Sequence, residues 1–203
     1  MKINKRIMIA DDEPEILKSY KDVFSTKEKT ISFFEEFETS DNYKVQMFID
    51  GDLLLDTFEE FYARKIRIPL VILDVMMPGM DGITTAKEIR KIDPDVMIIF
   101  ISGAANLDPE KIREELQHDN YYLRKPIDAD EFLSMVESLI KNWNKTQQIK
   151  LDLEINKLYA RELEEKNKEM EKYTYIFLNR EARIKELQEE INDLETKFNV
   201  ILP

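Results

Sequence analysis

Side chains that could do chemistry follow several short apolar runs in the first 126 residues. Asp11 and Asp12 stand directly behind Ile7–Ala10, and Asp74 stands behind Leu70–Leu73. Three carboxylates in one crevice repel each other unless one takes up a proton or a cation is bound. Mg²⁺ suits such a set because it is a hard ion that prefers oxygen ligands. These residues therefore predict a magnesium site.

A hydroxyl and an ammonium group follow two later apolar runs in the same way. Ser102 comes after Ile98–Ile101, and Lys125 comes after Tyr121–Leu123. With Mg²⁺ bound, Asp74 can stay ionised and attack phosphorus to give an aspartyl phosphate. Lys125 would place a positive charge beside one phosphoryl oxygen, and Ser102 would donate a hydrogen bond to another. The combination predicts a metal-assisted phosphoryl site.

Each signal also has an ordinary structural explanation when it is taken alone. Asp12 or Glu13 beside Pro14 could cap a helix, and Met80–Gly82 is a common type of turn sequence. Their arrival in a fixed order, each behind an apolar run or a turn, favours one shared site.

The elements that must position these residues alternate along the chain. We expect strands at Arg6–Ala10, Val45–Ile49, Ile68–Leu73, Val96–Ile101 and Tyr121–Leu123. We expect helices that begin near Pro14, carry Leu54 to Tyr62, run over Gly82–Ile92, and begin near Asp108 and near Asp128 or Asp130. This alternation predicts an α/β fold, a doubly wound parallel sheet of five strands with helices on both faces. In such a sheet, ligands bind at the carboxyl ends of the strands, where the polar side chains stand.

Residues 25–43 do not fit this alternation. They could prolong the first helix or form a separate short helix, with Ile31, Phe34 and Phe37 on one face. That face would cover extra domain surface or serve as a lid that binds a partner.

Composition limits the classes of function. The chain of 203 residues has a net charge of −12. Residues 141–203 hold 12 basic and 13 acidic residues, so nearly all of the net negative charge lies on residues 1–140. An acidic domain repels nucleic acid and anionic membranes, so we expect neither as a partner. The chain has no cysteine, too short an apolar start for a signal peptide, and no membrane-length apolar run. We expect a cytoplasmic protein.

The C-terminal part, residues 142–203, reads as one continuous helix, because no glycine or proline occurs from residue 127 to 202. Its apolar residues recur in alternating steps of three and four, which is typical of a coiled-coil seam. The seam residues are Ile184, Leu187, Ile191, Leu194, Phe198 and Ile201. Extended backwards, the seam includes Arg180 and Lys166, which weaken it, and the register shifts near residues 159–163.

The sequence favours a homodimer through this helix. In a parallel homodimer, however, Glu190 would face Glu195 of the other chain, which is a contact between like charges. A different partner chain or an antiparallel pairing therefore stays open.

Residues 5–141 resemble the receiver domain of two-component response regulators. The resemblance rests on the pair Asp11-Asp12, the segment Leu73–Gly82, Ser102 and Lys125-Pro126. It implies a flavodoxin-like sheet with strand order 2-1-3-4-5 and a domain that ends near residue 141. One departure is the 62-residue separation from Asp12 to Asp74, which residues 25–43 lengthen.

The resemblance also implies a role for each matching residue. Asp12 would bind Mg²⁺ directly and Asp11 mainly through water, while Met76 would offer its backbone carbonyl. Asp74 would accept the phosphoryl group beside Lys125. Ser102 and Tyr122 would form the switch that responds to phosphorylation.

By this resemblance, the phosphoryl donor is a histidine kinase or a phosphotransfer protein. The single histidine, His118, lies in a polar stretch and is expected at the surface, so the donor must be another protein. We expect no enzyme activity beyond self-catalysed transfer and dephosphorylation at Asp74. The alternatives are a degenerate receiver that acts as a coiled-coil scaffold, and the N-terminal part of a larger receiver–kinase or receiver–cyclase protein. A phosphatase of the haloacid dehalogenase type is disfavoured, because Met76 stands where its second acid belongs.

Overall fold

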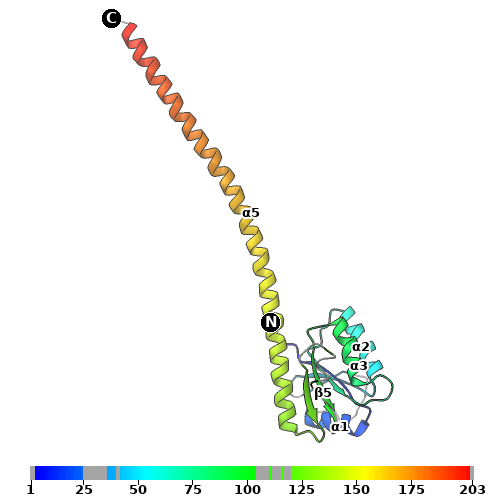
Figure 1. Cartoon of the computed structure of the whole chain (residues 1–203). Coiled ribbons are helices and arrows are strands. Elements are labelled where there is room, and N and C mark those ends of the chain that lie inside the picture. Colours follow the sequence, from blue (N-terminus) through cyan, green and yellow to red (C-terminus); the bar gives the residue numbers. More distant parts are fainter. Residues whose placement is uncertain are drawn as a thin grey trace. The chain divides into compact units, whose positions relative to one another are not determined.

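The computed structural model describes residues 3–24, 36–39, 42–103, 110, 116 and 120–201, with side chains described up to residue 194 of the last helix. The chain divides into two compact units, residues 1–148 and residues 149–203 (Figure 1). The first unit holds the whole sheet, and the second consists of the rest of the last helix.

Six strands form a single sheet in the order β2-β3-β1-β4-β5-β6. Their bounds are Arg6–Ala10 (β1), Phe37–Glu38 (β2), Lys44–Phe48 (β3), Leu70–Asp74 (β4), Met97–Ser102 (β5) and Tyr121–Arg124 (β6). All neighbouring strands run parallel except β2, which pairs antiparallel with β3 at the edge. The predicted doubly wound α/β fold is confirmed, and the five predicted strands follow the predicted order.

Four helices with described bounds connect or follow these strands. They are α1 (Pro14–Val23), α2 (Gly51–Ala63), α3 (Gly82–Ile92) and α5 (Ala129–Ile201). Pro14 occupies the first helical turn of α1, where a missing N–H costs nothing. The side chains of Asp50 and Asp81 cap α2 and α3 by accepting hydrogen bonds from backbone N–H groups three residues on, at 2.8 Å and 2.7 Å.

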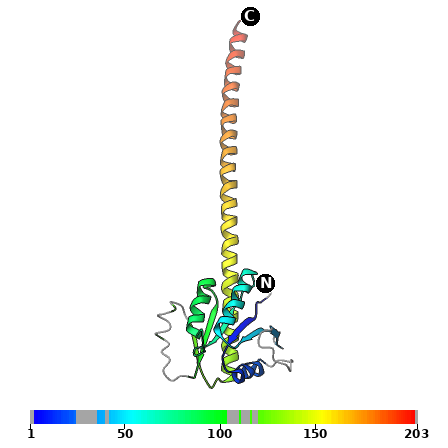
Figure 2. The ribbon, with the colours of Figure 1, turned by 90° about the vertical axis from the view of Figure 1, so that its right-hand side faces the viewer.

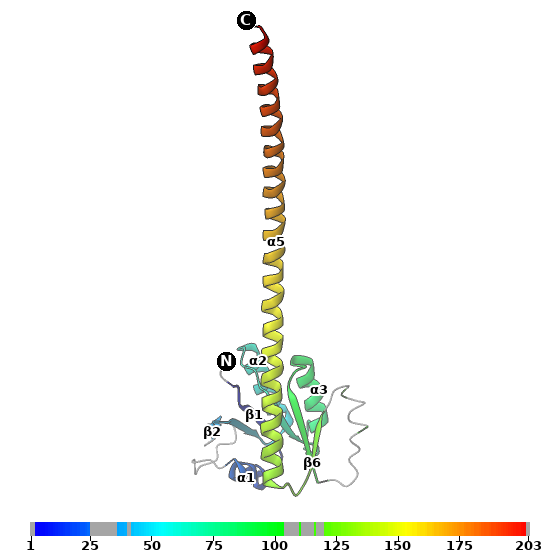
Figure 3. The same cartoon turned by 90° about the vertical axis from the view of Figure 1, so that its left-hand side faces the viewer.

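Helices cover both faces of the sheet, as the opposite views in Figures 2 and 3 show. One apolar core joins the sheet to α1 and to the first turns of α5, and a second joins it to α2 and α3. In the first core, Phe132 of α5 stacks on Tyr20 of α1, with ring centroids 5.6 Å apart. Burial of these apolar faces is the main force that holds the unit together.

Residues 25–43 differ from the prediction where the structure describes them. Helix α1 ends at Val23 with Phe24 as its C-cap, so it is not prolonged into this segment. Phe37 and Glu38 form the edge strand β2, and the Phe37 side chain is buried. Of the three apolar residues expected to share a helical face, only Phe37 lies among the described residues. A two-residue strand carries no periodic pattern, and so β2 could not be predicted from the sequence.

The helix expected near Asp108 falls largely outside the described residues, as does His118. Only Glu110 and Leu116 of that stretch are described, and both are helical.

Two polar contacts stabilise the amino-terminal end of the sheet, and the first of them holds α5 there. Asn144 of α5 and Asn4 exchange two hydrogen bonds of 2.8 Å. The Arg67 guanidinium makes a bidentate pair with the fully buried carboxylate of Asp93, at 2.7 Å and 2.9 Å. Bidentate pairing of this kind fixes geometry as well as neutralising a buried charge.

The second unit buries none of its described side chains. Every described residue from 149 to 194 is exposed, including the predicted seam residues Ile184, Leu187, Ile191 and Leu194. The continuous helix agrees with the sequence, whereas the coiled-coil pairing stays a prediction. Among the described helices, none is both long and apolar enough for a membrane span.

Candidate functional site

Four adjacent parallel strands bring the predicted site residues to one edge of the sheet. Asp11 follows β1, Asp74 ends β4, Ser102 ends β5, and Lys125 follows β6. These strands are neighbours in the order β1-β4-β5-β6. Because parallel strands place their carboxyl ends at the same edge, the four side chains meet although they are up to 114 positions apart.

The three predicted metal ligands converge. Asp11, Asp12 and Asp74 each offer one carboxylate oxygen, and these oxygens lie within 4.8 Å of one another. Asp11 and Asp74 are buried, and Asp12 is partly exposed. A set of carboxylate oxygens at this spacing fits Mg²⁺, which takes oxygen ligands and keeps some of its waters.

Lys125 bridges two of these carboxylates. Its Nζ lies 2.9 Å from Asp11 Oδ2 and 2.5 Å from Asp74 Oδ2, with Glu13 Oε1 further away at 3.3 Å. Burial by itself would lower the pKa of Lys125, but the hydrogen bonds to Asp74 and Asp11 outweigh it and raise the pKa. Lys125 is therefore positively charged at the point where negative charge gathers. It precedes Pro126 through a cis peptide bond.

Asp11 is the most deeply buried member of the cluster. Burial raises the pKa of its carboxyl group, although the hydrogen bond from Lys125 works in the opposite direction. The Tyr20 hydroxyl also donates to Asp11 Oδ2, at 3.4 Å, and burial raises the pKa of that hydroxyl. Sequence reasoning missed Tyr20, because its contact with the site arises only when α1 packs beside β1.

Backbone contacts hold Asp74 in place. Asp74 Oδ1 accepts a hydrogen bond of 3.0 Å from the N–H of Met76. The next residue, Val75, is fixed from both sides: its N–H donates to Ile101 and its carbonyl accepts from Gly82. The Asp74 side chain thus stands at the end of β4, beside a loop whose first residue is held by two backbone hydrogen bonds.

The Met80–Gly82 signal has a structural explanation. Asp81 caps α3, and a Cβ atom at Gly82 would collide with the backbone carbonyl of Asp74. The absence of a side chain at Gly82 lets the start of α3 approach the end of β4 closely. The motif therefore belongs to the scaffold of the site rather than to its chemistry.

The structure also places the remaining predicted residues. Ser102 is buried, and its carbonyl accepts a hydrogen bond of 3.0 Å from the N–H of Lys125. The Tyr122 ring stacks on Phe100, with centroids 5.6 Å apart and planes 23° apart. The Met76 side chain is exposed, and the metal-binding role of its carbonyl stays a prediction.

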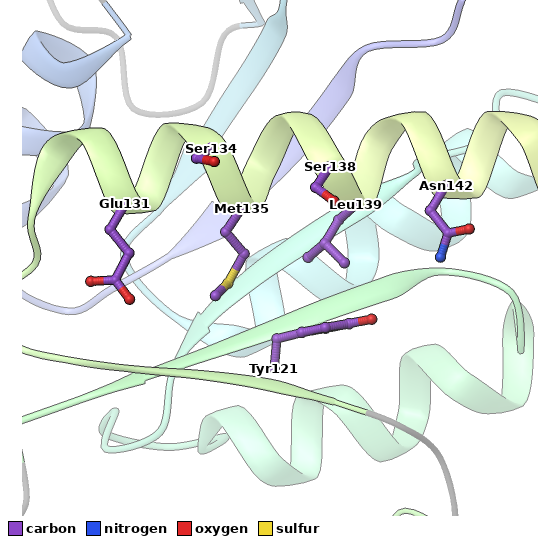
Figure 4. Close-up of a pocket in the computed structure, with 7 residues that line it drawn as sticks. All are labelled: Tyr121, Glu131, Ser134, Met135, Ser138, Leu139 and Asn142. Carbon is purple, nitrogen blue, oxygen red and sulfur yellow. The ribbon is translucent and has the colours of Figure 1, made fainter.

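Strand β6 connects the site to α5. Its side chains alternate, so that Tyr122 packs in the core shared with α2 and α3 while Tyr121 packs in the core shared with α5. Figure 4 shows Tyr121 facing α5, with Met135 and Leu139 of α5 directed toward it. These residues line a groove with Glu131, Ser134, Ser138 and Asn142.

Comparison with known proteins identifies this arrangement. Residues 7–137 match the response regulator receiver domain family. The chain belongs to that family. The match covers the sheet from the second residue of β1 onward and every predicted site residue, and it ends within α5.

Individual relatives agree with this assignment. The receiver is 40% identical over 82 residues to the transcriptional regulatory protein CssR of Bacillus subtilis, covering 39% of this chain and 36% of CssR. It is 32% identical over 104 residues to the chemotaxis protein CheY of Treponema pallidum, covering 51% and 69%. This chain thus matches little more than a third of the length of CssR, but over two thirds of CheY.

Solved structures agree on the fold. A CheY-like receiver domain protein from Methanospirillum hungatei superposes with a TM-score of 0.55 at 22% identity. The superposition covers 70% of this chain and 98% of the other.

Proposed function

We propose that this protein is a phospho-accepting receiver in which Asp74 takes a phosphoryl group from a histidine kinase or a phosphotransfer protein. The observation that carries the proposal is the convergence of Asp11, Asp12 and Asp74 with Lys125 bridging two of the carboxylates. The Lys125 ammonium neutralises part of the negative charge of this site, and the three carboxylates fit Mg²⁺ as a second cation.

The residues divide the work. In the transfer, a carboxylate oxygen of Asp74 forms a bond to phosphorus while the phosphorus–nitrogen bond of the donor's phosphohistidine breaks, and the released imidazole takes up a proton. Lys125 sits 2.5 Å from Asp74, where it can stabilise negative charge on the phosphoryl oxygens. Asp11, Asp12 and Asp74 would hold Mg²⁺, which supplies further neutralisation of that charge.

We propose self-catalysed transfer and dephosphorylation, with no turnover of a separate substrate. The position two residues after Asp74 is Met76, so no second acid stands there to work on such a substrate. A cytoplasmic location stays a prediction from the sequence.

From the sequence, the change is expected to pass through the face made by the fourth helix, the fifth strand and the fifth helix, and on through the C-terminal coiled coil. The fourth helix lies largely outside the described residues, whereas the fifth strand and helix are β6 and α5. A phosphoryl group adds about two negative charges at Asp74, which would draw the Ser102 hydroxyl toward it. Tyr122 lies on β6 opposite Phe100, which is two residues before Ser102 on β5, and Tyr121 packs on the other side of β6 against α5. A change in the packing of Tyr122 would therefore reach α5 through one strand, as a shift between two states.

We further propose that the chain forms a homodimer through the predicted seam of α5, within residues 149–201. Four large apolar side chains of the seam, Ile184, Leu187, Ile191 and Leu194, are between 41% and 65% exposed. Surface of this kind along a helix is typical of a segment that pairs with another helix.

Acetyl phosphate tests the phosphoryl chemistry without the cognate kinase. The full chain is incubated with acetyl phosphate and Mg²⁺, and its intact mass is measured. We expect one phosphoryl adduct that requires Mg²⁺ and is absent from Asp74→Asn. Asp22→Asn, which makes the same change at an exposed position of α1, should keep the adduct.

Two results would contradict the proposal. An adduct that persists in Asp74→Asn would place the acceptor elsewhere. No adduct in the unaltered chain would point to a receiver that acts as a scaffold.

A further inference from the structure

We propose that the C-terminal helix pairs antiparallel with a second copy of this chain, with Ile184 of one copy opposite Leu187 of the other. The proposal rests on the homodimer proposed above and adds its direction and register. It concerns only the second unit, residues 149–203, and so stands apart from the phosphoryl chemistry of the first.

The exposed seam supplies the contact surface. In a seven-residue repeat written abcdefg, Phe177, Ile184 and Ile191 fall at position a, and Leu187 and Leu194 fall at position d. All five side chains are at least 41% exposed, over about five turns of helix. An exposed apolar stripe of this length is buried only when another helix covers it. The charged residues beside the stripe indicate the direction in which that helix runs.

A parallel pair of copies would bring like charges together. Parallel helices place each d residue opposite the same residue of the partner. Arg180 and Lys166 are both at position d, so Arg180 would face Arg180 of the second copy and Lys166 would face Lys166. Two like-charge layers inside the seam oppose a parallel homodimer.

The antiparallel register removes the Arg180 conflict and adds opposite charges. Antiparallel helices place each a residue opposite a d residue, and each g residue opposite a g residue. With Ile184 opposite Leu187 of the second copy, Leu194 meets Phe177, and Arg180 meets Ile191 with Glu190 beside it. At position g, Arg183 meets Glu190 of the second copy, and symmetry makes this pair twice.

The structure leaves these g side chains accessible. Arg183 and Glu190 are both exposed, and within one chain Arg183 pairs with Glu186 at 2.9 Å. That contact is a surface pair three residues apart, which contributes little and leaves the guanidinium with further donors. A second acidic partner across the interface is therefore compatible with it. The two copies of this chain complement each other in charge only when they run in opposite directions.

Charge reversal at position 190 separates the two directions. Sedimentation equilibrium of the full chain would measure the dimer dissociation constant. In the antiparallel pair, Glu190→Lys turns two attractive contacts into repulsive ones, so we expect the dissociation constant to rise about tenfold. In the parallel pair, the same change removes a contact between like charges and should tighten the dimer.

Two further variants serve as controls. Glu189→Lys makes the same change one residue away at position f, on the outer face, and should leave the dissociation constant within about twofold. The double variant Arg183→Glu with Glu190→Lys should restore the affinity, because the opposite charges are present again in reversed order. Tighter binding in Glu190→Lys, or no rescue in the double variant, would overturn the proposal.

Cysteine cross-linking gives an independent test, since the chain has no cysteine of its own. Phe177→Cys and Leu194→Cys are made separately and oxidised alone or as a mixture. We expect a disulfide only in the mixture, because equal positions would stand about 26 Å apart, far beyond the reach of a disulfide. Cross-linking of Phe177→Cys alone would establish a parallel pair and overturn the proposal. A monomeric chain would overturn the homodimer as well, while the acetyl phosphate reaction would be unaffected.

Discussion

The two units of this protein treat apolar side chains in opposite ways. Residues 1–148 enclose most of their described apolar side chains in two cores on either side of one sheet. Residues 149–194 leave every described side chain exposed, although several of them are as apolar as those in the cores. Helix α5 belongs to both units, so the difference lies in what surrounds the helix and not in the secondary structure.

The first and the later turns of α5 therefore differ in what their apolar residues contribute to the stability of a single chain. The first turns of α5 gain stability from burial within their own domain, as Phe132, Val136 and Trp143 show with at most 3% exposure. The later turns gain nothing from their apolar residues until another helix covers them. Matched substitutions in the two parts of one helix can therefore test the comparison directly.

The largest effect is expected from Phe132→Ala. Phe132 is 1% exposed and contacts the rings of Tyr20 and Phe24. Its truncation should lower the free energy of unfolding of the first unit by about 3–5 kcal/mol. Urea unfolding followed by the fluorescence of Trp143, the only tryptophan, would measure it. A loss below about 1 kcal/mol would show that α5 is not anchored there.

A smaller effect is expected from Mg²⁺, which should act on the first unit alone. A metal that binds only the folded state adds about 1–3 kcal/mol when its concentration is about 10 to 100 times its dissociation constant. The same Trp143 transition should shift in the unaltered chain and in Asp22→Asn, but not in Asp12→Asn. An equal shift in Asp12→Asn would show that the Asp12 carboxylate does not bind the metal.

The smallest effect on unfolding is expected from Leu187→Ala. Leu187 is 41% exposed, and alanine is at least as good a helix former. At a concentration where the chain is monomeric, the Trp143 transition should change by less than about 0.5 kcal/mol. The dimer dissociation constant should nevertheless rise by tenfold or more, because a seam layer loses its contacts. Loss of stability in the monomer would mean that the second unit packs against something within its own chain.

Much of the fold and of the site could be predicted because both follow from short-range patterns. The apolar runs marked the parallel strands to within two residues at either end, and β1 was predicted at Arg6–Ala10 as found. Once the strands are parallel, residues at their carboxyl ends must meet. The convergence of Asp11, Asp74 and Lys125 therefore needs no knowledge of packing.

Features that depend on packing alone could not be predicted. The contact of Tyr20 with Asp11 requires the rotation of α1 on the sheet, and no spacing in the sequence encodes it. The pairing of Arg67 with Asp93 joins two loops at the opposite edge, where no motif exists. Strand β2 is too short to show alternation, and helical spacing of neighbouring apolar residues suggested a helix instead.

The short strand β2 covers part of the edge of the sheet at β3. β3 carries Val45, Met47 and Phe48, and without a neighbour its outer edge would invite strands from other molecules. β2 occupies part of that edge, and Glu36 beside it binds Arg6 and Lys44 at 3.2 Å and 3.4 Å. A stubby strand flanked by charge is a poor template for further growth of a sheet. The short strand β2 and the ion pairs of Glu36 thus leave less of the β3 edge open to strands of other molecules.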